Sequence, residues 1–475
     1  MPYQSTSLDP TDWRVMRAAG HRMMDDMFDH LANLRGLPVW QPMPADVRAA
    51  FSQKLPTQGQ DVEALYESFR NTIQPYVSGN THPHFMGWVQ GGGNVVSMLA
   101  ELLAGAMNEN CGGRDHVGLS VERQVIAWAA EITGMPPSTS GVLLTGSSMA
   151  NFIAVLCART KALGQTAREE GIKTTPLVAY ASQGVHRCVP GALDMAGLGF
   201  NALRKIPVDA DYRMNIPALR AAIKSDRAAG KTPFLIVGTA GSVDVGAFDD
   251  LAALSEIAKE FGLWFHVDGA FGALGCLSPS LRPQLAGIAE ADSIALDFHK
   301  WAQVTYDAGC ILIRDSEVHI ATFSQATSYL AAAPRGLAGG QPWPCDLGPD
   351  LSRSFRALKI WMTISAYGSE KLGHVIDHSC ALAKHLSQRI EQSDVLELSA
   401  PVPLNIVCFR VKHYTDTQNA NLVADLQEAG LFAPSTTILN DQLAIRAAIV
   451  NHRTQISDID ALVDEITRRA VQRAN

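Results

Sequence analysis

Hydrophobic and polar residues alternate along the middle of the chain in blocks that predict a sheet covered by helices. Short apolar runs typical of buried strands occur at 141–145, 176–181, 233–239, 263–268, 293–298 and 308–314. Stretches with helical spacing lie between them, at 148–163, 188–198, 216–229, 249–261 and 280–290. Strands that alternate with helices are typical of a mostly parallel sheet, in which functional sites gather at the carboxyl ends of the strands.

The first part of the chain has a different pattern. Residues 13–34 place apolar side chains at helical spacing, and prolines at 38, 42, 44 and 56 then interrupt the pattern. One helix cannot bury such a stripe alone. We therefore expect an arm that packs on another surface, such as a second subunit.

The last part of the chain predicts a smaller α+β domain. A long helical stretch at 354–394 is followed by short strands near 407–411 and 443–450 and by an amphipathic helix at 456–472. We therefore divide the chain into three regions: a helical arm (1–85), a large domain (86–350) and a small C-terminal domain (351–475).

Composition and charge exclude several classes of protein. Of the 475 residues, 47% are hydrophobic and 18% are charged, which is enough apolar material for a large core. The net charge of −8 offers no basic surface for nucleic acid, and no apolar run approaches the ~20 residues of a membrane span. The N-terminus lacks the features of a signal peptide, and the eight scattered cysteines lack the spacing of a zinc site. We expect a cytoplasmic protein with reduced thiols and no metal.

Two charged residues follow predicted strands. Asp268 ends the run in HVDGA, and Lys300 follows the run in ALDFHKW. A lysine at a buried strand end is partly desolvated, which would lower its pKa and make a neutral amine available. A neutral amine beside a fixed carboxylate suits Schiff-base chemistry. A structural ion pair between Asp268 and Lys300 is an alternative of about equal weight.

Two further motifs also follow strands. In TGSSMAN, Gly146 permits a close backbone approach, and Ser147 and Ser148 open a helix whose N-terminus can bind a small phosphate. The motif lacks the lysine of a P-loop and the GxGxxG of a nicotinamide enzyme, and an ordinary helix cap is the alternative. His186 could lie flat on an aromatic ring, although a lone histidine is more often structural.

Together these motifs resemble the pyridoxal 5′-phosphate site of fold-type I enzymes and, more narrowly, of the group II amino acid decarboxylases. The resemblance covers nearly the whole chain and rests on THPHFMGW (81–88), GTAGSVDVGAFDDL (238–251), HVDGAFGA, FHKW and SRSFRALKIW (352–361). It implies an α/β fold: a large domain with a mostly parallel seven-stranded sheet covered by helices, a smaller α+β domain and a helical arm. It also implies a homodimer with its active site at the subunit interface.

The resemblance assigns roles to individual residues. It implies that Lys300 binds the cofactor aldehyde, that Asp268 holds the pyridine nitrogen and that His186 stacks on the ring. It places the rest of the cofactor among Ser147, Ser148, Thr239, Ala270 and His299. Asp297 stands where many relatives have asparagine, so an acidic side chain would face the phosphate.

The implied reaction is the decarboxylation of an L-amino acid to an amine and CO2. Tyr329 matches the loop tyrosine that the family ties to protonation at Cα, and relatives with phenylalanine there are associated with aldehyde formation. Asn110, Trp88 and Arg446 match substrate-binding positions, and Arg446 matches an arginine proposed to face the α-carboxylate.

The substrate and the exact chemistry stay open at this point. We slightly favour an aromatic amino acid as substrate. An acidic amino acid (glutamate, aspartate or cysteine sulfinate) and a decarboxylating aldehyde synthase are alternatives within the family. Another fold-type I enzyme and a non-catalytic relative are alternatives outside it.

Overall fold

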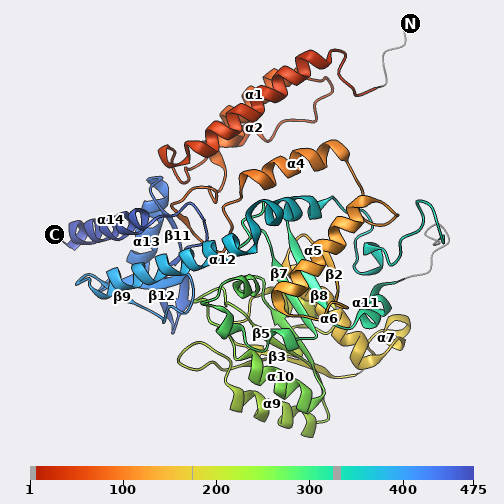
Figure 1. Ribbon diagram of the computed structural model, residues 1–475. Helices are drawn as coiled ribbons and strands as arrows, with labels where there is room; N and C mark the ends of the chain where they lie inside the picture. The colour runs from red at the N-terminus through yellow and green to blue at the C-terminus, as the bar shows by residue number, and fades with distance from the viewer. Residues whose placement is uncertain (1–6, 174, 325–332, 475) are drawn as a thin grey trace.

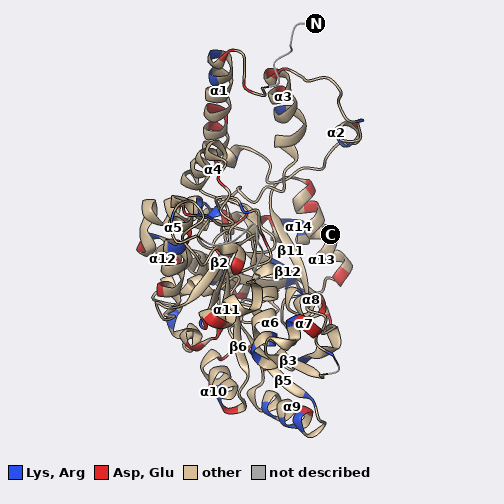
Figure 2. Ribbon diagram, turned by 90° about the vertical axis from the view of Figure 1, so that its right-hand side faces the viewer, with Lys and Arg blue, Asp and Glu red and all other residues tan. Residues whose placement is uncertain are grey.

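A computed structural model describes residues 7–173, 175–324 and 333–474 of the chain and shows three parts (Figure 1). The arm consists of three helices: α1 (Trp13–Ala32), α2 (Ala45–Ala50) and α3 (Val62–Ser68). These helices stand clear of the rest of the molecule (Figure 2), and Ala19 is the buried residue of α1. Trp13, Val15, Met16 and Phe28 of the apolar stripe are exposed in a single chain, whereas Leu34 at its end is buried. None of the described helices is long and apolar enough to cross a membrane.

The large domain is built on a seven-stranded sheet. Its order is β2 (Ser140–Leu144), β8 (Gly309–Ile313), β7 (Ser293–Asp297), β6 (Trp264–Asp268), β5 (Thr232–Thr239), β3 (Leu177–Ser182) and β4 (Leu203–Ile206). β8 runs antiparallel to both of its neighbours, and the other strands run parallel to one another. The predicted fold class and the predicted seven-stranded, mostly parallel sheet are confirmed.

Helices cover both faces of this sheet. They are α5 (Val117–Thr133), α6 (Ser147–Leu163), α8 (Cys188–Met195), α9 (Ile216–Ala228) and α10 (Leu251–Phe261). The shorter helices α7 (Thr166–Glu170) and α11 (Ser316–Phe323) pack on α6, and α4 (Val95–Met107) packs on the long helix Arg356–Glu391. Successive residues of a strand pack into the hydrophobic cores on opposite faces of the sheet. Ile236 and Ile294 pack with α9 and α10 on one face. Val237 and Ala295 pack with α6 and α8 on the other. Because both faces are buried, the strands read as continuous apolar runs.

The small domain contains a second sheet. Its order is β1 (Phe85–Met86), β11 (Ala433–Leu439), β12 (Gln442–Ala448), β10 (Ile406–Val411) and β9 (Leu396–Leu398), with α13 (Asp416–Glu428) and α14 (Ile456–Ala474) packed beside it. The long helix α12 (Arg356–Glu391) runs from the large sheet to the small one and bends at Gly368, where φ is 73° (Figure 1). β1 pairs in parallel with β11, so the chain at the predicted end of the arm joins the small sheet.

The structure corrects the helix predicted at 280–290. That segment forms two short 3-10 turns, Arg282–Leu285 and Ile288–Glu290. Pro283 cannot donate a backbone hydrogen bond, and Gly287 has a φ of 92°, which a continuous helix does not allow. β4 and β11 were not predicted from the sequence.

Candidate active site

A cavity of about 410 Å³ opens where β5, β6 and β7 end at their carboxyl ends. The side chains and backbone that line it come from Trp88, Val89, Gln90, Thr145, Gly146, Ser147, Ser148, His186, Cys188, Thr239, Gly241, Val243, Asp268, Ala270, Phe271, Asp297, His299, Lys300 and Tyr306. Every residue that the sequence predicted to hold the cofactor is in this set. The structure therefore brings together predicted cofactor-binding positions that lie up to 153 residues apart in the chain, from Ser147 to Lys300.

The strand register explains this convergence. Thr239 lies beside Asp268 on the neighbouring strand, and Asp268 lies beside Ala295. Asp297 ends β7, and the chain then turns to Lys300. Because parallel strands end at the same edge of the sheet, their last side chains point to one place.

Lys300 pairs with Asp297 and not with Asp268. Its Nζ atom lies 2.9 Å from Asp297 Oδ2. Burial would by itself lower the pKa of the Lys300 amine, but the charge and hydrogen bond of Asp297, together with the charge of Asp268, raise that pKa above its usual value. The sequence-based expectation of a lowered pKa is therefore wrong for the protein without bound groups, and the amine is held as a cation.

Asp268 is 5% exposed, and one of its two carboxylate oxygens has only a weak hydrogen-bond donor beside it. Its Oδ1 atom accepts a hydrogen bond from the backbone N–H of Ala270 at 3.2 Å. Its Oδ2 atom lies 3.8 Å from the thiol of Cys188, which is a weak donor. This oxygen can accept a stronger donor, such as the N–H of a protonated pyridine ring.

The N-terminus of α6 forms an anion-binding corner of the cavity. α6 begins at Ser147, directly after Gly146. A Cβ atom on Gly309 of β8 would lie 2.4 Å from Gly146 Cα, so only glycine at position 309 lets the helix start this close to the sheet. The buried Ser147 Oγ and Thr239 Oγ1 atoms have no hydrogen-bond partner among the described residues. The orphaned hydroxyl of Ser147, at the helix N-terminus, fits a phosphate group, and that of Thr239, at the end of β5, offers a further donor to a bound ligand.

Two histidines occupy different places in the cavity. The ring of His299 is buried and packs against the ring of Tyr306, with 4.3 Å between centroids. Burial lowers the pKa of His299, and its Nδ1 atom accepts a hydrogen bond from the backbone N–H of Ala308 at 3.1 Å. His186 is exposed at the edge of the cavity, and its Nδ1 atom accepts from the N–H of Cys188 at 3.3 Å. The exposed ring is free to cover a planar ligand.

Two predicted site residues, Asn110 and Arg446, do not line this cavity. Asn110 lies in a separate hollow, and its Oδ1 atom accepts from the backbone N–H groups of Gly112 and Arg353. The guanidinium of Arg446 donates to the carbonyl oxygens of Val243 and Trp88, among other acceptors. Tyr329 lies outside the described residues.

The sequence did not single out several residues that shape the site. Cys188, Phe271 and Tyr306 line the cavity. Beneath the site, the buried His266 bonds Asn151 Oδ1 at 2.9 Å and Ser293 Oγ at 2.8 Å, which ties α6 to β7. Burial lowers the pKa of His266 to about 4, so its ring is neutral. Its place in the same HVD strand as Asp268 was the available signal.

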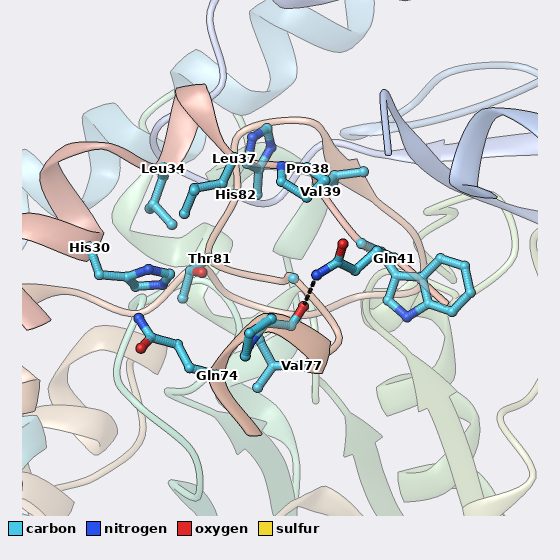
Figure 3. A pocket seen from close by; sticks show the side chains of 13 residues that line it. His30, Leu34, Leu37, Pro38, Val39, Gln41, Gln74, Val77, Thr81 and His82 are labelled. Carbon is cyan, nitrogen blue, oxygen red and sulfur yellow. Dashed lines mark hydrogen bonds between the residues drawn. The ribbon is translucent and has the colours of Figure 1, made fainter. Parts of the chain in front are cut away.

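A smaller cavity of about 190 Å³ lies within the arm, between residues 30–41 and residues 74–82 (Figure 3). Gln41 Nε2 donates to the carbonyl of Pro75 at 3.0 Å there, and apolar side chains such as Leu34, Leu37 and Val39 form much of the wall. Neither Lys300 nor His186 lines it. In the described part of the chain, no group of three or more His, Cys, Asp or Glu residues could hold a metal ion. The chemistry-bearing side chains are concentrated in the large cavity.

Comparison with known proteins decides the family. Residues 44–412 match the pyridoxal-dependent decarboxylase conserved domain. The chain belongs to this family. An aromatic-L-amino-acid decarboxylase of Bacillus atrophaeus is 31% identical over 474 residues, which cover 95% of this chain and 96% of that protein. A phenylacetaldehyde synthase of Arabidopsis thaliana is 28% identical, with 93% of each chain covered.

Solved structures of amino acid decarboxylases have the same fold as this chain. A crystal structure of Oryza sativa TDC with PLP and tryptamine superposes with a TM-score of 0.91 at 23% identity, covering 99% of this chain and 100% of that one. The protein is therefore a pyridoxal phosphate-dependent amino acid decarboxylase, a carboxy-lyase. The orphaned hydroxyls in the cavity, the carboxylate of Asp268 and the amine of Lys300 fit this cofactor.

Proposed function

We propose that this decarboxylase converts an aromatic L-amino acid to its amine and CO2. The observation that carries the proposal is the apolar wall of the cavity. Trp88 lies there with 57% of its surface exposed, and Val89 and Phe271 are further lining residues. An acidic side chain would need a cationic partner. The described lining contains no arginine, and Lys300 is already paired with Asp297.

In this proposal the cofactor-binding residues are those that the family resemblance implied. When bound, the cofactor supplies an aldehyde that reacts with amines and a ring that accepts electrons. Lys300 holds the cofactor through Nζ, and Asp268 keeps a proton on the ring nitrogen because an adjacent carboxylate favours the cationic form. His186 covers the ring. The remaining contacts come from Ser147, Ser148, Thr239, Ala270 and His299.

Arg446 has a positioning role in this proposal and does not bind the substrate carboxylate directly. Its Nη1 atom donates to the carbonyl of Trp88 at 3.2 Å, and its Nε atom donates to the carbonyl of Val243 at 2.9 Å. Trp88 has a left-handed φ of 51°, which is uncommon for a bulky residue. The buried guanidinium therefore holds the indole wall in an otherwise unfavourable backbone conformation.

A substrate screen with a wall variant tests the substrate class. CO2 release and amine formation are measured for tryptophan, tyrosine, phenylalanine, glutamate, aspartate and cysteine sulfinate. We expect turnover of an aromatic substrate, and Trp88→Ala should raise its KM by about 10-fold because an apolar contact is lost. Phe200→Ala, which removes an exposed aromatic side chain outside the cavity, is the matched control. Faster turnover of an acidic substrate by the wild type would contradict the proposal.

We further propose that Tyr329 protonates Cα after CO2 has left. The Tyr329→Phe variant keeps the ring and loses the hydroxyl, so amine formation should fall by about 10²-fold or more. Part of the product should appear as aldehyde and ammonia, formed with consumption of dissolved O2 and release of H2O2. Both products can be measured by chromatography and an ammonia assay. Unchanged amine formation with no aldehyde would show that Tyr329 is not the proton donor.

We also propose that the active unit is a homodimer. Large apolar side chains are exposed on two helices, namely Trp13, Val15, Met16 and Phe28 on α1 and Leu102, Leu103 and Met107 on α4. Exposed apolar groups of this size mark interaction surfaces. A second copy that covers them would also bring the hollow around Asn110 to an interface, where Asn110 could reach a partner's substrate.

Light scattering tests the dimer. The wild type should have twice the chain mass of 51.1 kDa. Replacing Leu102 and Leu103 together by aspartate should shift the protein to monomer, because buried carboxylates are costly at an apolar interface. Phe200→Asp changes an exposed apolar residue elsewhere and should leave the mass unchanged. A monomeric wild type would contradict the proposal.

A further inference from the structure

Asp297 places a buried carboxylate in the anion-binding corner of the cavity. The residue is 3% exposed, and its Oδ2 atom pairs with Lys300 Nζ at 2.9 Å. Its Oδ1 atom is buried and has no hydrogen-bond partner among the described residues. A Cβ atom built on Gly146 would lie 3.8 Å from this Oδ1 atom. The free oxygen therefore lies beside the first turn of α6, where a phosphate would bind.

Among the described groups that face Asp297, one cation offsets its negative charge. On its own turn, His299 Nε2 lies 3.6 Å from Oδ2, and burial keeps the pKa of His299 low. The charge of Asp297 also shifts the pKa values of three other groups, namely Tyr306, Cys188 of α8 and Cys310 of β8. Burial raises the pKa of each of these three groups, and the charge of Asp297 raises it further, so they are neutral. Among the described residues, Lys300 is the cation in contact, and it is shared with Asp268.

A phosphate in this corner would add further negative charge beside the same lysine. Two like charges in one buried site disfavour the ionised form of the weaker acid. The weaker acid of the two is the phosphate, whose second pKa is about 6, so it is the group that keeps a proton and can donate its O–H to the Asp297 carboxylate. The unpartnered Oδ1 atom is the acceptor for that hydrogen bond.

We propose that Asp297 is a further cofactor-binding residue whose free Oδ1 atom accepts a hydrogen bond from the phosphate, so that binding of the cofactor takes up one proton from solvent to form that bond. Binding is then linked to protonation. Affinity should fall by about 10-fold for each pH unit above about pH 6, where the free phosphate monoester loses its second proton. An asparagine at this position donates from its amide without taking up a proton, so this part of the pH dependence should vanish.

Calorimetry of the apo protein tests the proposal. The probe is 4′-deoxypyridoxine 5′-phosphate, which lacks the aldehyde and therefore cannot react with Lys300. Titrations run between about pH 7 and pH 8.5, where a phosphate monoester with a second pKa of about 6 is already a dianion. Two buffers with different ionisation enthalpies give the number of protons taken up. Asp297→Asn should take up about one proton fewer than the wild type and bind about 10-fold more tightly at the upper pH.

A matched variant separates this effect from a general change of charge. Asp250→Asn makes the same charge change at the N-cap of α10, where asparagine caps equally well and which lies outside the cavity. It should match the wild type in proton uptake and affinity. Equal proton uptake by Asp297→Asn and the wild type, or weaker binding by Asp297→Asn, would overturn the proposal. If Asp297→Asn does not fold, the wild type still tests the proposal, because binding without proton uptake would overturn it.

Discussion

Replacing Lys300 by alanine is expected to abolish both decarboxylation and covalent attachment of the cofactor. The Nζ atom is the amine that lines the cavity at the ends of β6 and β7, and alanine offers no nucleophile in its place. We expect kcat to fall by at least about 10⁴-fold. Amine formation and the visible absorbance of the lysine-bound cofactor are the two measurements.

A charge-preserving variant separates attachment from ion pairing. Lys300→Arg keeps a cation beside Asp297, but a guanidinium stays protonated and does not act as a nucleophile. It should therefore be as inactive as Lys300→Ala while melting closer to the wild type. Near-normal activity of Lys300→Arg would show that the lysine acts only through its ion pair with Asp297.

Replacing Asp268 by asparagine should lower kcat by about 10²–10³-fold without releasing the cofactor from Lys300. The amide is the same size and can still accept the N–H of Ala270. It lacks the negative charge that keeps a proton on the ring nitrogen, so the ring becomes a weaker electron acceptor. Steady-state kinetics and the visible spectrum report the two effects separately.

A modified cofactor provides the control for this variant. Pyridoxal phosphate methylated on its ring nitrogen carries a fixed positive charge there and needs no carboxylate to maintain it. It should restore part of the activity of Asp268→Asn. If Asp268→Asn is as active as the wild type, or if the methylated cofactor restores nothing while it still attaches to Lys300, the role given to Asp268 is wrong.

The sequence predicted the central strands of the large sheet well because strands that are buried on both faces appear in the sequence as unbroken apolar runs. β6 and β7 were found in this way, and with them the strand-end positions of Asp268 and Lys300. β4 escaped because its four residues include Arg204 and Lys205, so only its ends are buried. β11 escaped because it is half exposed and contains Pro434.

Contacts between distant segments could not be predicted from local patterns. The guanidinium of Arg446 is bound by carbonyls that lie more than 200 residues away in the chain. The sequence offered an ion pair of Lys300 with Asp268 as an alternative, but the turn after β7 brings Asp297 closer. That i, i+3 pair reverses the direction of the lysine's pKa shift, because the nearest charge outweighs burial.

Chemical trapping of the holoenzyme tests most directly the claim that Lys300 carries the cofactor. Borohydride reduction makes the bond between cofactor and lysine permanent, and peptide mass spectrometry then locates it. We predict that the added cofactor mass is found on the peptide that contains Lys300 and on no other lysine peptide. A label on a different lysine, or a fully active holoenzyme that gives no labelled peptide, would contradict the account.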